Sequence, residues 1–249
     1  MTTLGIIPAR FGSTRLEGKP LAMIGNKTMI ERVFEQCLAS KSLQKVVAAT
    51  DDQRIFDAVR AFGGEVLMTQ PTHQNGTSRC GEAYTLLNQK FDVVVNIQGD
   101  EPFINPKQID ELVAVFNENS LVDIATLVRK IDDLAVLNSV STPKVVRSID
   151  GKALYFSRSV VPHLRGIDPK DYLKHHIFYQ HIGIYAYRFD VLAKINTLEP
   201  TFLEQAECLE QLRWLENGFN IFTNVSDFNS FAIDTPEDLA VANALCQTI

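Results

Sequence analysis

The chain contains little cysteine and has no excess of positive charge. Its four cysteines, Cys37, Cys80, Cys208 and Cys246, are far apart and form no C-x-x-C pair. This spacing excludes a zinc knuckle or a disulfide scaffold and favours reduced thiols. The formal net charge of −6 argues against a nucleic-acid-binding surface. We therefore expect a small anionic ligand and no nucleic-acid partner.

Long hydrophobic runs and the common cofactor fingerprints are also missing. Pro8 and Arg10 interrupt the first apolar run before it reaches the length of a signal sequence or membrane helix. We therefore expect a cytoplasmic protein with no membrane partner. The absence of G-x-G-x-x-G removes the main argument for NAD or FAD. His175 and His176 lack spaced metal-ligand partners, which favours a structural or dimer-contact role.

The 249 residues, 45% of them hydrophobic, are enough to bury a large core. Apolar runs at 3–8, 45–50 and 92–98 alternate with amphipathic segments, which is typical of β-α-β units. The runs are continuous, as expected for parallel strands covered on both faces. The pattern changes near 143, where Asp150-Gly151 predicts the turn of an antiparallel hairpin. We expect an α/β protein with a mixed, mostly parallel central sheet flanked by helices.

Capping residues mark several helix starts. Asp51-Asp52 is expected to cap a helix that ends at Gly63-Gly64, and Asn105-Pro106 is expected to start another. A helical pattern follows through Leu203, Leu209, Leu212 and Leu215. A strand at 220–225 and a capped helix from Asp234-Thr235-Pro236 complete the chain.

The segment 4–21 is the strongest functional signal. We expect a buried strand followed by a loop that contains Gly12 and Gly18, hydroxyl groups, and the cations Arg10, Arg15 and Lys19. Glycines allow the backbone to approach a ligand, and several cations can neutralise several phosphates. The spacing is not that of a Walker motif, because five residues separate the glycines and Pro20 follows the lysine. A surface loop with scattered cations is the less favoured alternative.

A second signal lies in the segment Val93–Phe103, where Gln98, Gly99 and Asp100 follow an apolar run. Ligands of open α/β sheets bind at the carboxyl ends of strands. A short carboxylate at that place suits Mg²⁺, which prefers oxygen ligands. By itself the segment is equally consistent with a turn held by its own hydrogen bonds.

The segment Phe231–Leu239 is most simply interpreted as a helix start. Asp, Thr, Pro and Glu in this order can supply a cap and first-turn acids. On the residues alone, Asp234 is a cap, and Glu237 and Asp238 are ordinary first-turn acids.

Several blocks, in order along the chain, together resemble the sugar cytidylyltransferase family over essentially the full chain. The opening loop is similar to the pattern PAR-x-GS-x-R-x-x-GK-P-L, and His73–Arg79 is similar to H-x-x-GT-x-R. Two further matching blocks are NIQGDEP at 96–102 and IDTPEDL at 233–239. Tyr155–Ser159, Gln180–Tyr185 and Glu207–Arg213 support the match. Glu17 departs from the usual Pro, and Ser78 from the usual acid between Thr77 and Arg79, so this chain has no acid there for a base or ribose contact.

The resemblance implies a Rossmann-like nucleotide-diphospho-sugar transferase fold in one domain, 1–249. Within it, 1–130 would be mainly nucleotide-binding, 143–188 a hairpin and dimerisation element, and 189–249 the sugar- and metal-binding part. A homodimer is therefore expected.

The resemblance also implies the reaction and the residues that perform it. CTP would donate CMP to an acidic sugar, with 3-deoxy-manno-octulosonate (KDO) as the expected acceptor, for lipopolysaccharide biosynthesis. Lys19, Arg15, Asp100 and Asp234 would be catalytic, and Asp100 and Asp234 would hold Mg²⁺. CTP would contact Ala9, Arg10, Ser13, Arg15, Lys19, Thr77, Arg79 and Gln98. The sugar acid would contact Gln98, Arg158, His181, Tyr185, Glu207 and Gln211.

Two alternatives remain. The first is the same chemistry on another acidic sugar such as sialic acid. The second is a nucleotide sensor without catalysis, although a sensor would have no need for two metal ligands. Taken singly, Glu207, Glu210 and Arg213 fit a solvated helix face, and Tyr185 fits a core position.

Overall fold

The computed structural model describes residues 1–12, 15–229 and 231–246. They form two compact units, of which the first contains residues 1–110 and the C-terminal segment from 229, and the second contains 111–228. The expectation of a single functional domain with internal parts at 1–130, 143–188 and 189–249 stays a prediction. No helix of the described chain is long and apolar enough to span a membrane.

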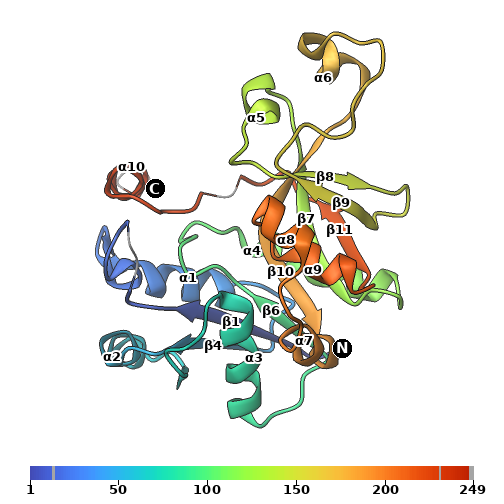
Figure 1. Cartoon of the computed structure of the whole chain (residues 1–249). Helices are drawn as coiled ribbons and strands as arrows, with labels where there is room; N and C mark the ends of the chain where they lie inside the picture. The colour runs from blue at the N-terminus through green and yellow to red at the C-terminus, as the bar shows by residue number, and fades with distance from the viewer. Residues whose placement is uncertain (13–14, 230, 247–249) are drawn as a thin grey trace. The chain divides into compact units, whose positions relative to one another are not determined.

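The first unit is built on parallel strands in the order β6-β1-β4-β5, with helices packed around them (Figure 1). The four strands are β1 (Thr3–Ala9), β4 (Lys45–Thr50), β5 (Val66–Met68) and β6 (Val93–Asn96). The helices are α1 (Met29–Leu38), α2 (Gln53–Ala61), α3 (Gly76–Leu87) and α10 (Pro236–Cys246), with the short η1 (Lys19–Leu21) and the hairpin β2 (Met23–Ile24) and β3 (Lys27–Thr28). Strands β1, β4 and β6 are buried along nearly their whole length, which confirms that both faces are covered.

The predicted helix caps of this unit are present. The Asp52 side chain accepts a hydrogen bond from the backbone of Arg54 at the start of α2, and Gly63 beyond its end has a φ of +83°. Asn105 accepts a hydrogen bond from the backbone of Lys107 at the start of α4 (Pro106–Glu118). The chain passes from the first unit to the second within α4.

The second unit mixes parallel and antiparallel pairing. Strand β7 (Ile124–Lys130) pairs parallel with β11 (Ile221–Val225) and antiparallel with β10 (Tyr179–Arg188). The predicted hairpin is confirmed as β8 (Lys144–Arg147) and β9 (Ala153–Ser157), and β8 also pairs with β10. The short helices are α5 (Leu134–Asn138), η2 (Pro169–Asp171), α6 (Tyr172–His175), α7 (Phe189–Ile195), α8 (Phe202–Glu207) and α9 (Gln211–Glu216).

The helical pattern expected around 203–215 is present as two short helices. Helix α8 ends at Glu207, and Cys208 adopts a left-handed conformation with a φ of +50° before α9 begins at Gln211. Periodicity of apolar residues continues across such a break, because both helices bury the same kind of face.

A β-bulge interrupts β10. Ile182 is opposite Leu127 and Tyr185 is opposite Thr126, so residues 183–184 are extra on β10. His181 and Tyr185 are four residues apart in the sequence, but their partners on β7, Val128 and Thr126, are only two residues apart.

Candidate active site

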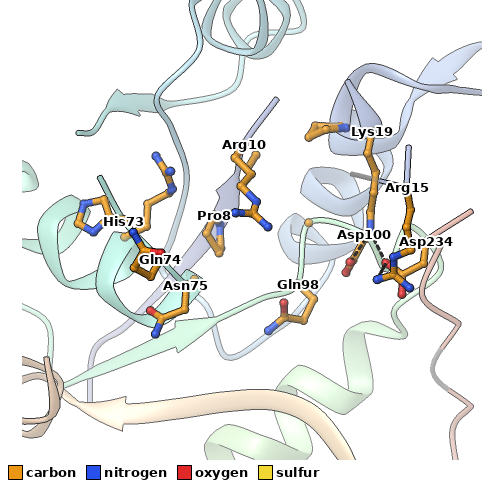
Figure 2. A pocket seen from close by; sticks show the side chains of 15 residues that line it. Pro8, Arg10, Arg15, Lys19, His73, Gln74, Asn75, Gln98, Asp100 and Asp234 are labelled. Atoms are coloured by element: carbon orange, nitrogen blue, oxygen red, sulfur yellow. Dashed lines mark hydrogen bonds and ion pairs between the residues drawn. The ribbon is translucent and has the colours of Figure 1, made fainter. Parts of the chain in front are cut away.

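A cavity of about 310 Å³ lies in the first unit, beside the carboxyl ends of β1 and β6 (Figure 2). This is the edge at which ligands bind in open α/β sheets. The structure brings together at this cavity most of the residues predicted for CTP and metal: Ala9, Arg10, Arg15, Lys19, Arg79, Gln98, Asp100 and Asp234. Ser13 lies outside the described residues, and Thr77 is buried but does not line the cavity.

The carboxylates of Asp100 and Asp234 converge on one amine. Lys19 Nζ is 2.6 Å from Asp100 Oδ2 and 2.9 Å from Asp234 Oδ1. Arg15 adds a second cation, with a guanidinium nitrogen 3.0 Å from Asp234 Oδ1. Figure 2 shows these four side chains pointing toward one another from segments far apart in the sequence. Two cations therefore balance two carboxylates at one end of the cavity.

The backbone explains how Asp100 reaches this position. Gly99 passes so close to β1 that an added Cβ would lie 2.9 Å from the carbonyl oxygen of Pro8. A side chain there would force the two strand ends apart. Asp234 is held next to Asp100, because the backbone N–H of the preceding residue, Ile233, donates to the carbonyl of Asp100 over 2.9 Å.

Asp234 does not cap α10. The cap is formed by Thr235 and Asp238: Asp238 Oδ2 accepts from the backbone N–H groups of Asp234 and Thr235, and Thr235 Oγ1 accepts from the backbone of Asp238. These hydrogen bonds, led by that from Asp234, lower the pKa of Asp238. The reciprocal arrangement is that of a capping box. The side chain of Asp234 is left to face Lys19 and Arg15.

The opening loop is closed by its second glycine. Gly18 has a φ of +65°, and its N–H donates to the carbonyl of Phe11 over 3.0 Å. This left-handed residue leads directly into η1, which carries Lys19. The Lys19 side chain is only 12% exposed. Glu17, where the family pattern has proline, is exposed and leaves this closure intact.

The loop before α3 and the first turn of that helix form the opposite wall and contain four of the lining residues that were not predicted to contact a ligand. The lining residues that were not predicted to contact a ligand are Pro8, Pro20, His73, Gln74, Asn75, Gly76 and Gly99. His73 contacts Ser78 Oγ through Nδ1, at 3.1 Å, and the Glu82 carboxylate through Nε2. Ser78 therefore holds the loop, and a nucleotide contact through an acid at this position is absent in this chain. The H-x-x-GT-x-R block was a signal that could have identified His73.

Arg79 lines the cavity but its guanidinium is already paired. One terminal nitrogen donates to Thr69 Oγ1 over 2.6 Å, and the other lies 3.1 Å from Asp51 Oδ2. The side chain is 4% exposed. Arg79 thus fixes the wall between α2 and α3, with Asp51 serving as its counter-ion.

The donor set at Lys19 fits a hard divalent cation. Within residues 1–12, 15–229 and 231–246, no three His, Cys, Asp or Glu side chains gather into a complete metal site. Two converging carboxylates, Asp100 and Asp234, are nevertheless the protein ligands that Mg²⁺ usually takes when substrate phosphates and waters supply the rest.

Five residues predicted for the sugar acid belong to the second unit, and the side chains of two of them, Arg158 and Glu207, already have several partners. Arg158 donates to the carbonyls of Glu207, Val140 and Cys208, at 2.7, 3.0 and 3.2 Å. The Glu207 carboxylate accepts from Ser157 Oγ and from the backbone N–H of Arg158. The guanidinium has five N–H groups, so three such bonds leave donors for a further anion.

Lys144 supports the same segment and was not predicted. Its side chain is fully buried, and its Nζ donates to the carbonyls of Ser139 and Thr142, each at 2.9 Å, and of Arg158. Desolvation lowers the pKa of Lys144. The ammonium group thus supplies the hydrogen bonds that these three carbonyls would otherwise need from backbone N–H groups. No sequence pattern predicts this role.

The other three residues present polar atoms inside the second unit. Tyr185 and Gln211 are buried, and Tyr185 Oη and Gln211 Nε2 have no hydrogen-bond partner among the described residues. A buried polar atom without a partner costs about 1–3 kcal/mol. The His181 ring lies 5.2 Å from that of Tyr185, and desolvation lowers the pKa of His181 to about 3. These atoms are suited to a polyhydroxylated ligand that supplies the missing partners.

Comparison with known proteins agrees with this geometry. The family model described as cytidylyltransferase matches residues 4–225. The chain is 53% identical to a 3-deoxy-manno-octulosonate cytidylyltransferase of Bacteroides thetaiotaomicron, with 96% of each chain covered, and 50% identical to one of Cytophaga hutchinsonii over 96% and 95%. A solved structure of CMP:2-keto-3-deoxy-manno-octonic acid synthetase complexed with CTP superposes with a TM-score of 0.92 at 39% identity, covering 100% of this chain and 99% of the other. The chain belongs to the cytidylyltransferase family.

Proposed function

We propose that this protein is a 3-deoxy-manno-octulosonate cytidylyltransferase, which converts CTP and KDO into CMP-KDO and diphosphate. The observation that carries the proposal is the convergence of Asp100 and Asp234 on Lys19 inside a cavity that also contains Arg10 and Arg15. Cations bind a triphosphate, and paired carboxylates are a feature that nucleotide binding alone does not require. Relatives with this activity are about half identical over nearly the whole chain.

In the proposed reaction, the anomeric hydroxyl oxygen of KDO attacks the α-phosphorus of CTP in line. The new oxygen–phosphorus bond forms as the bond from the α-phosphorus to the bridging oxygen of diphosphate breaks, and the hydroxyl proton is released to solvent. Arg10, Arg15 and Lys19 neutralise the charge that moves onto diphosphate. Such transfers depend mainly on positioning and charge neutralisation.

We propose Mg²⁺ as the cofactor, held by Asp100 and Asp234. When bound, Mg²⁺ would supply positive charge to the reacting phosphate and favour ionisation of the attacking hydroxyl. Lys19 is a counter-ion of both carboxylates. The residues present therefore fit the ion, and the lysine keeps the two like charges together.

For the sugar acid we propose Gln98, Arg158, His181, Tyr185, Glu207 and Gln211. The partnerless atoms Tyr185 Oη and Gln211 Nε2 support a ligand rich in hydroxyl groups, and Arg158 supports a carboxylate. We further propose that the protein acts in the cytoplasm and forms a homodimer through 143–188. Light scattering of the purified protein measures the dimer directly.

A coupled assay of diphosphate release tests the function. CTP and Mg²⁺ are supplied with KDO, sialic acid or a neutral sugar in parallel reactions. We expect turnover with KDO alone. Turnover with sialic acid and not with KDO would show that sialic acid is the acceptor substrate. Binding of CTP without any turnover would identify a nucleotide sensor.

A further inference from the structure

Thr126 is a fully buried residue of β7 whose hydroxyl lies against the bulge of β10. Thr126 Oγ1 is 2.8 Å from the carbonyl oxygen of Ile184, 3.2 Å from that of Ile182 and 3.0 Å from Nε2 of His181. One hydroxyl therefore contacts the carbonyl just before the bulge, a carbonyl within it and the imidazole of His181.

The chemistry of these atoms determines where the protons lie. A carbonyl oxygen only accepts, so a hydroxyl oxygen at 2.8 Å from it must donate its single proton there. The oxygen of Thr126 then faces His181 Nε2 with a lone pair, and the contact at 3.0 Å requires a proton on Nε2. In a neutral imidazole the other nitrogen, Nδ1, is then an acceptor.

The same contact arranges the two aromatic residues. Residues four apart in a regular strand are about 13 Å apart along it. The bulge at 183–184 shortens this separation, and the rings of His181 and Tyr185 lie 5.2 Å apart. Phe156 packs edge-on against the His181 ring from β9, at 5.3 Å between centroids. The His181 ring is thus held by Phe156 and Tyr185 through ring contacts and by Thr126 through Nε2.

We propose that Thr126 is a positioning residue for the acceptor sugar: it holds His181 as the Nε2-protonated tautomer, so that Nδ1 accepts a hydrogen bond from a sugar hydroxyl. The role of His181 as a sugar contact rests on the proposed function. The tautomer itself does not, because it follows from the contacts of Thr126 in the protein alone. The tautomer makes this position selective for a hydrogen-bond donor on the ligand.

The first test is ¹⁵N nuclear magnetic resonance of the histidine side chains in the ligand-free protein at pH 7. His181→Gln identifies the His181 signals by their loss. We expect the wild-type pattern of a neutral ring protonated at Nε2, and we expect Thr126→Val to shift the ring toward the other tautomer. A wild-type proton on Nδ1 overturns the proposal, and this result needs only the wild-type protein.

The second test compares Thr126→Val with Thr126→Ser, which keeps the hydroxyl. We expect the valine variant to raise the KM for KDO about tenfold, the effect of one misdirected hydrogen bond, while the KM for CTP is unchanged. The serine variant should restore both the tautomer and the KM. An equal change in both KM values, or no change in tautomer and KM, would overturn the proposal.

Thr223→Val is the matched control. Thr223 is also a buried strand residue of this unit, and its hydroxyl donates to the carbonyl of Gly151 over 2.9 Å. It should lower the Tm without altering the His181 tautomer. If wild-type protein shows no turnover with KDO, the proposed function fails, whereas the resonance experiment still decides the role of Thr126.

Discussion

The first unit and the second unit prepare their ligand-binding residues in opposite ways. In the first, charged side chains meet one another: Lys19 and Arg15 neutralise Asp100 and Asp234. In the second, the Arg158 guanidinium is held by backbone carbonyls, and the Glu207 carboxylate by the Ser157 hydroxyl and the backbone N–H of Arg158. Tyr185 and Gln211 have buried polar atoms without a partner among the described residues.

This difference shows how each unit stabilises a site that must later receive a ligand. A triphosphate and a metal ion bring charges that can exchange partners with an existing cluster of ion pairs. A sugar brings hydroxyl groups, and its binding free energy is most favourable where protein polar atoms that are already desolvated acquire a hydrogen-bond partner. The contrast can be tested by removing one group at a time.

The largest effect is expected from the two carboxylates. Asp100→Asn and Asp234→Asn should each reduce kcat by roughly 10³-fold or more, because loss of a metal ligand removes several kcal/mol of transition-state stabilisation. Mg²⁺-dependent kinetics measure this loss. The nearby Asp238→Ala is the control: it removes the helix cap, so stability should fall by about 1 kcal/mol while kcat is retained. Near-normal kcat for Asp234→Asn at limiting Mg²⁺ would contradict the assignment.

Lys19→Met is expected to be next in size. It should reduce kcat by about 10²-fold, as a lost electrostatic contact to the transition state does. The Lys19 side chain is mostly buried between two carboxylates, so its removal leaves two like charges close together without a counter-ion. We therefore expect a lower Tm without Mg²⁺ and recovery when Mg²⁺ is added. A Tm independent of Mg²⁺ would show that the ion does not replace the lysine charge.

Arg158→Ala tests the second unit. It should raise the KM for KDO much more than the KM for CTP, and Arg158→Lys should restore it only in part, because an ammonium cannot reproduce the planar fork. The three bonds to backbone carbonyls predict a simultaneous fall in Tm. Steady-state kinetics with each substrate varied in turn, at a temperature well below the lower Tm, separates the two effects. A rise confined to CTP would place Arg158 in the phosphate site.

The smallest effect concerns His181 and pH. Its pKa is about 3 in the folded protein, below the ordinary value of 6.5. Between these values the unfolded chain binds a proton that the folded chain does not, so stability is lost as the pH falls from 7 toward 3. Thermal unfolding of His181→Gln should therefore show a weaker fall in Tm over this range than the wild type. Parallel curves would mean that the ring is protonated normally.

The sequence predicted the parts of the site that are local. Gly18 next to Lys19, Gly99 next to Asp100, and the strands before them are all adjacent in the chain, so spacing and residue type were sufficient. The hairpin at Asp150-Gly151 and the caps at Asp52 and Asn105 were predicted for the same reason. The role of Asp234 could not be separated from capping until the structure showed Asp238 in that place.

Sequence by itself determined that cations, glycines and carboxylates stand at the ends of buried strands, because these properties depend on residue type and short spacing. Only the tertiary structure decided which charges meet. The bond from Ile233 to Asp100 brings Asp234 to Lys19, and Thr126 joins β7 to a bulge whose register no local pattern specifies. Contacts between distant segments depend on how strands are paired and how closely side chains pack, and these are properties of the whole fold.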